Sequence, residues 1–160
     1  MKKTRRTVLQ LILGNLALGA AFPALARAEE FAVSYSDAEW RQRLSPIAYA
    51  VLRNKATERP WTSPLLEEHR KGTFACAGCD LPLFSSDTKF DSGTGWPSFF
   101  APLEGAIADS VDYDLGYART EVHCSRCGGH QGHVFDDGPK PTGLRYCING
   151  VALSFLPDAA

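Results

Sequence analysis

Five cysteines have the most informative spacing in this 160-residue sequence. Four of them form two C-x-x-C pairs, Cys76 with Cys79 and Cys124 with Cys127, and Cys147 stands apart from both. A two-residue gap lets a tight turn direct both thiolates at one cation, about 2.3 Å from each sulfur. Two such pairs from distant parts of the chain can complete a closed tetrahedral site, for which we expect zinc. A four-thiolate site has no open coordination position, so the expected role is structural.

Two disulfides are the alternative for these four cysteines, because an oxidising compartment favours disulfide formation. A chain that folds before export would load its metal first. The zinc prediction therefore depends partly on the route of export.

The unpaired Cys147 lies between an arginine and an asparagine, Arg145 and Asn149. Arg145 can lower the pKa of the thiol, and Asn149 can donate a hydrogen bond to an anion. The alternative is a buried, inert thiol, which is common for a single cysteine in an apolar strand. These neighbours favour a reactive thiolate.

Two histidines, His130 and His133, lie in a glycine-rich segment that we expect to be a turn and not a core strand. A second metal site is the alternative, but no spare cysteine could complete it, whereas a thiol enzyme needs a proton donor. Thiolate, imidazole and amide together suit redox or acyl-transfer chemistry. The histidines precede Cys147 by only 17 and 14 residues, which argues against a papain-like protease.

A loop of two glycines and a proline surrounds Trp96 within residues 91–100. Such a loop can present the indole to a methyl group of a ligand. Core packing beneath a turn is the alternative.

The elements that must position these residues differ between the two parts of the chain. Residues 36–43 read as a capped helix, and residues 46–54 and 64–71 are two further short helical candidates. From Gly72 onward, short apolar pieces alternate with Gly, Pro, Asp and Ser, which is typical of β-structure. We therefore predict a small, mainly β antiparallel domain with short N-terminal helices, and strands at residues 73–75, 81–84, 118–123, 133–135, 144–148 and 151–155.

The first 28 residues are predicted to be an export signal, followed by one domain over residues 29–160. A cationic start with Arg5 and Arg6 precedes an apolar run over residues 11–26, with small-x-small cleavage sites after Ala26 or Ala28. The arginine pair resembles a twin-arginine signal, although ordinary secretory signals also contain such pairs. Glycines, an asparagine and a proline interrupt the run, so we expect no permanent membrane span. The expected location is periplasmic or otherwise exported.

The signal also carries much of the positive charge. It holds five of the 17 Lys and Arg and none of the 18 Asp and Glu, which leaves the remaining chain with a net charge of −6. Nucleic-acid binding is not expected, because phosphate recognition needs clustered basic residues.

Several motifs in order resemble the B type of methionine sulfoxide reductase over residues 49–155. They are residues 76–84 (CAGCDLPLF), 87–93 (DTKFDSG), 95–99 (GWPSF), 129–139 (GHQGHVFDDGP) and 145–149 (RYCIN). The resemblance implies two antiparallel sheets meeting at an angle, with the zinc joining the two C-x-x-C turns away from the active centre. It also implies reduction of methionine-R-sulfoxide to methionine.

The resemblance further implies a role for each motif residue. Cys147 would attack the substrate sulfur and be left as sulfenic acid. Trp96 would pack on the substrate methyl, and Phe99 is assigned with it to substrate binding. His130 and His133 would protonate the sulfoxide oxygen. Arg145 and Asn149 would stabilise the thiolate and the charge that develops in the reaction.

The sequence departs from a common form of that family at Thr94, where many members have the cysteine that resolves the sulfenic acid. No sixth cysteine replaces it, so we expect an external thioredoxin-like or other thiol reductant. Gln131, where Leu is more usual, is a smaller departure. Oxidised proteins are the expected substrates, and use of free methionine sulfoxide is left open. The competing classes are a zinc-bound interaction module and a disulfide scaffold, which leave Cys147 and the histidines unexplained.

Overall fold

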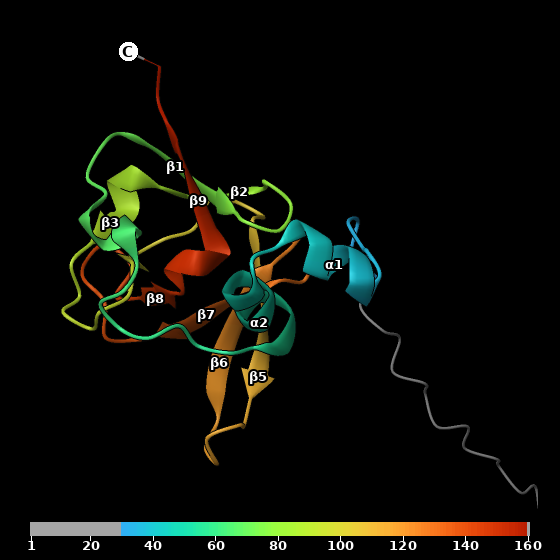
Figure 1. The fold of residues 1–160 in the computed structure, drawn as a ribbon. Helices are drawn as coiled ribbons and strands as arrows, with labels where there is room; N and C mark the ends of the chain where they lie inside the picture. The colour runs from blue at the N-terminus through green and yellow to red at the C-terminus, as the bar shows by residue number, and fades with distance from the viewer. Residues whose placement is uncertain (1–29, 160) are drawn as a thin grey trace, which may run out of the picture.

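Residues 30–159 are described by the computed structural model, and they form two antiparallel sheets (Figure 1). The smaller sheet has the order β2-β1-β9 and the larger has the order β3-β4-β8-β7-β6-β5. This confirms the predicted mainly β class with two antiparallel sheets. The strands are β1 (Gly72–Cys76), β2 (Pro82–Ser85), β3 (Lys89–Phe90), β4 (Ser98–Phe99), β5 (Ile107–Asp112), β6 (Arg119–Cys124), β7 (His130–Phe135), β8 (Arg145–Ile148) and β9 (Leu153–Pro157).

Two short helices precede the sheets, as predicted. Helix α1 (Asp37–Arg43) begins after Ser36, whose side chain forms a reciprocal capping box with Glu39. Helix α2 (Pro46–Asn54) has a proline in its first turn and packs against β7. The third predicted helix is shorter than expected: only a 3₁₀ turn, η1 (Pro64–Glu67), forms within residues 64–71.

Three phenylalanines join the sheets in one core. Phe74 on β1 and Phe84 on β2 both contact Phe99 on β4, with ring centroids 5.0 and 4.3 Å apart, and all three side chains are fully buried. Burying each such ring contributes about 1.5–3 kcal/mol. This cluster holds β4, and with it the loop that carries Trp96, against the smaller sheet.

The observed strands differ from the predicted ones in segments where the apolar character of the sequence does not match the burial of the side chains. Residues 130–132, predicted to lie in a glycine-rich turn, instead form the buried first half of strand β7, whose second half was predicted as a strand over residues 133–135. Gly132 allows close packing there, since a Cβ would lie 2.0 Å from the carbonyl oxygen of Cys147. Strand β5 was not predicted, since it is a largely exposed edge strand rich in polar residues. The first part of the strand predicted at 151–155 is instead the 3₁₀ turn η3 (Gly150–Ala152).

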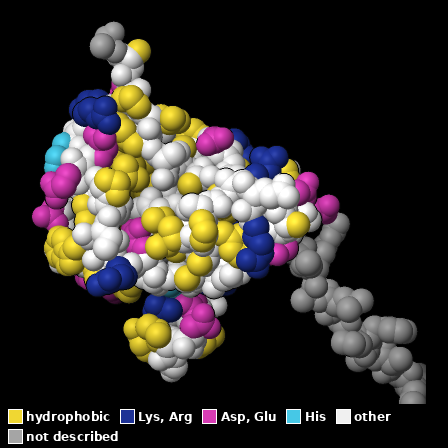
Figure 2. All heavy atoms as spheres, in the orientation of Figure 1, with side chains coloured by type: hydrophobic (Ala, Val, Ile, Leu, Met, Phe, Trp, Pro, Cys, Tyr) yellow, Lys and Arg dark blue, Asp and Glu magenta, His cyan; other side chains and the backbone are white. Residues whose placement is uncertain are grey.

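The hairpin of β5 and β6 projects from the body, and its tip carries exposed hydrophobic side chains (Figures 1 and 2). They are Val111, Tyr113, Leu115 and Tyr117. No helix among residues 30–159 has both the length and the apolar character to cross a membrane. The predicted signal segment lies outside the described residues.

Candidate active site

Cys147 lies at the centre of the larger sheet, on β8. It is directly opposite His133 on β7 and Ser98 on β4. The same strand pairing places Trp96 nearby, since it lies two residues before Ser98. Sheet register therefore brings together a thiol, an imidazole and an indole that are far apart in the sequence.

A small pocket of about 130 Å³ opens at this thiol. It gathers four residues predicted from the sequence, which are Cys147, His133, Trp96 and Asn149. Thr57, Arg119, Gly132 and Phe135 complete the lining. The pocket is far smaller than the roughly 300–1,000 Å³ typical of drug-sized ligands, so it suits one side chain.

Burial raises the pKa of the Cys147 thiol, although Thr94 and the Arg145 guanidinium both act to lower it. The Thr94 hydroxyl lies 3.8 Å from the sulfur. The predicted effect of Arg145 is therefore present in direction but is outweighed by desolvation. Burial therefore favours the thiol over the thiolate at Cys147.

The His133 ring is held by a carboxylate that the sequence analysis did not single out. Its Nε2 lies 2.7 Å from Asp112 Oδ2, and Asp112 also forms an ion pair with Arg119. Burial lowers the pKa of His133, and the hydrogen bond that its ring donates to the Asp112 carboxylate partly opposes this effect. Asp112 thus fixes the ring orientation and supports the protonated form.

A second carboxylate holds His130, whose ring lies beside His133 with centroids 5.4 Å apart. His130 Nδ1 lies 2.8 Å from Glu121 Oε1, and both side chains are buried. Burial raises the pKa of Glu121, but hydrogen bonds from His130, Lys55 and Ser110 lower it to about 2. Among the described residues, His130 Nε2 is a buried nitrogen without a hydrogen-bond partner.

Glu58 organises the other side of the pocket, although it lies in an irregular segment with no motif to mark it. Its carboxylate accepts hydrogen bonds from the backbone N–H groups of Gly150 and Val151, and its backbone oxygen accepts one from the Trp96 indole at 3.1 Å. Its backbone N–H donates to Asn149 Oδ1 at 3.0 Å. Glu58 therefore positions both Trp96 and Asn149.

Asn149 does not bind the thiol directly. Its amide group donates to the Gln131 backbone oxygen at 3.0 Å and accepts from Glu58, so both ends of the amide have backbone partners. Asn149 lines the pocket from this fixed position.

Three predicted site residues lie outside the pocket lining, namely His130, Arg145 and Phe99. Arg145 forms a bidentate ion pair with Asp137, at 2.8 and 2.9 Å, and its guanidinium stacks on Phe135. Phe99, predicted to bind substrate, does not line the pocket, and its side chain is fully buried between Phe74 and Phe84. Side chains alternate along a strand, and Phe99 faces the core.

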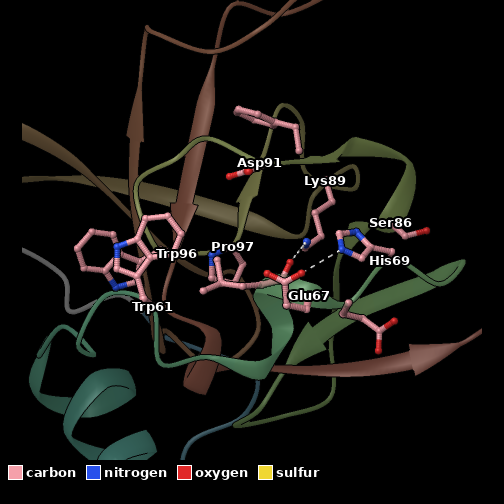
Figure 3. A pocket seen from close by; sticks show the side chains of 11 residues that line it. Trp61, Glu67, His69, Ser86, Lys89, Asp91, Trp96 and Pro97 are labelled. Carbon is pink, nitrogen blue, oxygen red and sulfur yellow. Dashed lines mark hydrogen bonds and ion pairs between the residues drawn. The ribbon is translucent and has the colours of Figure 1, made fainter.

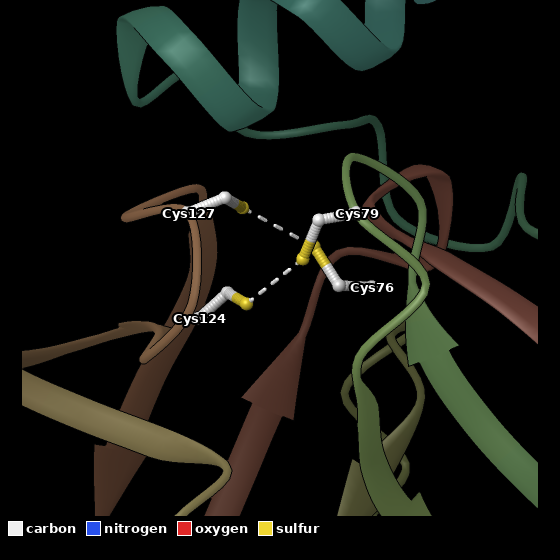
Figure 4. A group of neighbouring side chains, drawn as sticks. All are labelled: Cys76, Cys79, Cys124 and Cys127. Atoms are coloured by element: carbon white, nitrogen blue, oxygen red, sulfur yellow. Dashed lines mark hydrogen bonds between the residues drawn. The ribbon is translucent and has the colours of Figure 1, made fainter. Parts of the chain in front are cut away.

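The four paired cysteines meet in one cluster (Figure 4). Their sulfur atoms lie within 4.8 Å of one another, with Cys76 to Cys127 at 3.7 Å and Cys79 to Cys124 at 3.5 Å. Sulfurs that share one tetrahedral zinc are about 3.8 Å apart, whereas a disulfide is near 2.0 Å. All four are free thiols that could bind a metal ion, and they connect β1 of the smaller sheet to β6 of the larger.

Gln131 lies between this cluster and the pocket. Its side-chain amide donates to Cys76 Sγ at 3.5 Å, and its backbone oxygen accepts from Asn149. Gln131 thus gives one sulfur of the cluster a polar contact.

Comparison with known proteins agrees with this arrangement. A SelR domain matches residues 44–157. Peptide methionine sulfoxide reductase MsrB of Agrobacterium fabrum (strain C58 / ATCC 33970) is 56% identical over 126 residues, covering 78% of this chain and 93% of that protein. The MsrB protein of Leptospira interrogans serogroup Icterohaemorrhagiae serovar Lai (strain 56601) is 52% identical over 129 residues, covering 80% and 98%.

The chain therefore belongs to the SelR family of oxidoreductases, and within it to the B type of peptide methionine-R-sulfoxide reductase.

Proposed function

We propose that this protein reduces methionine-R-sulfoxide in oxidised proteins to methionine, with Cys147 as the nucleophile that becomes a sulfenic acid. The observation that carries this proposal is the pocket in which the Cys147 thiol, the His133 imidazole and the Trp96 indole converge. Trp96 offers an apolar face for the methyl group, and His133 offers a proton for the sulfoxide oxygen.

The reaction balances as a two-electron transfer between sulfur atoms. Cys147 attacks the substrate sulfur, and the sulfoxide oxygen takes up the thiol proton and one proton from solvent and leaves as water; the solvent proton is returned when the next water loses a proton in its attack. A second water then attacks the Cys147 sulfur, which releases the methionine thioether and leaves the sulfenic acid. The cysteine sulfur is oxidised by two electrons and the substrate sulfur is reduced by two.

Proton supply follows from the pKa shifts of the two reacting groups. Burial keeps Cys147 protonated and His133 neutral at neutral pH. The proton that the thiol loses on attack can therefore pass to the sulfoxide oxygen through His133. His133 must carry this proton transiently, and Asp112 stabilises that state.

We expect Asp112→Asn to lower kcat roughly tenfold at neutral pH, since general acid catalysis is worth about 10²–10⁴-fold. Asp112 raises the pKa of His133, whereas Arg119 lowers it, so removing the carboxylate moves that pKa further down. The basic limb of the pH–rate profile should shift to lower pH, and NMR titration of His133 should show the same direction. Asp114→Asn, two residues along the same hairpin, is the matched control. An unchanged profile in Asp112→Asn would rule out this role.

We also propose that the four-cysteine cluster holds one structural zinc. Its support is the donor set, four sulfur atoms at tetrahedral spacing where the two sheets approach each other, with three of the four cysteines buried. When bound, the metal would link distant strands by coordinate bonds, and it has no part in the redox steps.

The oxidised Cys147 requires an external reductant under this proposal. The other four cysteines lie together in the cluster, and the position that contacts the Cys147 sulfur holds Thr94. Two equivalents of an external thiol, as in a thioredoxin-like dithiol, would return the sulfenic acid to the thiol with release of water and a disulfide.

The test of the proposed reaction is an assay of purified protein on both sulfoxide epimers with dithiothreitol as reductant. We expect turnover of the R epimer only. Turnover of the S epimer alone, or of neither, would contradict the proposal.

The same assay without reductant tests the recycling step. We expect one methionine per chain, a dimedone adduct at Cys147, no intramolecular disulfide and no zinc release. Thr94→Cys should instead form a disulfide with Cys147, which mass spectrometry would detect. An intramolecular disulfide in the unmodified protein would show that a cluster cysteine resolves the sulfenic acid.

The place of action that we propose is the periplasm, with repair of oxidised exported proteins as the role. This rests on the sequence pattern of residues 1–28, with Arg5 and Arg6 ahead of an apolar run. The SelR match begins after this segment, at residue 44.

A further inference from the structure

Trp61 is an exposed tryptophan held in a constrained position beside the active site. Its side chain is 65% exposed, and its backbone φ of 64° lies in the left-handed region, which is costly for a residue with a Cβ. The backbone N–H of Trp61 donates a hydrogen bond to the backbone oxygen of Gly95 at 2.8 Å. A Cβ at Gly95 would lie 2.9 Å from the Trp61 indole, so the ring packs on the backbone next to Trp96.

Trp61 and Trp96 lie side by side at one end of a second hollow, larger than the thiol pocket (Figure 3). This hollow has a volume of about 370 Å³. Trp96 lines both the hollow and the pocket that contains Cys147. A polypeptide whose sulfoxide side chain fills the thiol pocket would therefore place a neighbouring residue at the hollow, since adjacent residues are about 3.3–3.6 Å apart along an extended chain.

The charges of the hollow favour a cationic side chain. Glu67, Glu68 and Asp91 contribute carboxylates to its lining. Glu68 is paired with Arg70, and Glu67 lies 3.5 Å from His69 Nε2, so the exposed Glu67 and Asp91 are the carboxylates that can face a ligand. The Lys89 ammonium carries the opposite charge. It donates a hydrogen bond to the Leu66 backbone oxygen at 2.8 Å, so it is less available to repel a cationic ligand. A tryptophan face is also the best aromatic partner for a cation.

We infer that this hollow is a second substrate subsite, in which Trp61 binds the side chain of a Lys or Arg that flanks the methionine sulfoxide in the polypeptide. The inference rests on the proposed function and extends it to sequence preference. Trp61 acts as a specificity residue and does not touch the reacting atoms.

The test compares three blocked tripeptides, with Lys, Ser or Glu next to methionine-R-sulfoxide, and N-acetyl-methionine-R-sulfoxide as the minimal substrate. The unmodified protein should rank them Lys over Ser over Glu by kcat/KM. In Trp61→Ala, the ratio of kcat/KM for the Lys peptide to that for the minimal substrate should fall about tenfold, mainly through KM. Glu67→Gln should lower the preference for Lys over Glu about two- to threefold, because one carboxylate is neutralised.

Two further variants separate binding from backbone effects. Trp61→Gly removes the indole and also relieves the left-handed backbone, and it should give the same change in ratio as Trp61→Ala. Tyr113→Ala removes another exposed aromatic, at the hairpin tip, and should leave the ratio unchanged.

Three outcomes would overturn the subsite. They are no side-chain preference in the unmodified protein, an unchanged ratio in both Trp61 variants, and an equal loss on all four substrates, which would mean that Trp61 only supports Trp96. An unmodified protein that reduces no R epimer would overturn the proposed function, and the subsite with it.

Discussion

Cys147→Ser is expected to lower turnover of methionine-R-sulfoxide by at least roughly 10⁴-fold. A serine hydroxyl is far less nucleophilic than a thiol, and it cannot form a sulfenic acid. The fold should be retained, because the substitution is nearly isosteric and Cys147 lies at the pocket, outside the hydrophobic core cluster. The measurements are kcat/KM on the R epimer, far-UV circular dichroism and metal content.

Cys147→Ala provides the control for this experiment. It also removes the nucleophile, so it should be as inactive as the serine variant, and both should keep the zinc content of the unmodified protein. Residual turnover in either variant at even one per cent of the unmodified rate would show that another group attacks the substrate.

Cys124→Ser is expected to have the largest effect on stability, and Cys79→Ser a similar one. Binding of structural zinc contributes about 10–16 kcal/mol in small zinc domains, which is comparable to the whole stability of about 5–15 kcal/mol of an ordinary domain. Loss of one ligand should therefore release the metal, lower the melting temperature and reduce solubility. The purified unmodified protein should contain one zinc per chain.

Ser125→Ala is the matched control, because Ser125 lies in the same turn as Cys124 and its side-chain hydroxyl donates to the Gly105 backbone oxygen and not to a cluster sulfur. Its zinc content and melting temperature should remain close to those of the unmodified protein. The alternative has a distinct signature: two disulfides by mass spectrometry and no bound metal would replace the zinc site with a disulfide scaffold.

Site residues could be predicted from the sequence where their function depends on a short, fixed spacing along the chain. The two C-x-x-C pairs predicted the four-sulfur cluster, since a two-residue gap in a tight turn limits where the sulfurs can point. The turn of the second pair ends at Gly128, which lies in the left-handed region with a φ of 66°. In the first pair that conformation is adopted by Asp80, and not by Gly78.

The supporting carboxylates could not be predicted in the same way. Asp112 and Glu121 reach His133 and His130 only because β5, β6 and β7 are neighbours in the larger sheet. The Glu58 carboxylate accepts a hydrogen bond from the backbone N–H of Gly150, which is 92 residues away in the sequence. No local pattern marks such contacts, which depend on strand order.

By itself, the sequence determined the mainly β class, the short helices with their caps, the four-cysteine cluster and the separation of Cys147 from it, because local propensity and spacing encode these features. Only the tertiary structure decided that residues 130–132 belong to a strand, that Phe99 faces the core and that Trp96 lines two hollows. It also decided the protonation of Cys147, since desolvation of the thiol outweighs the nearby Arg145. Burial is a property of the packed chain, and neighbouring residue types do not reveal it.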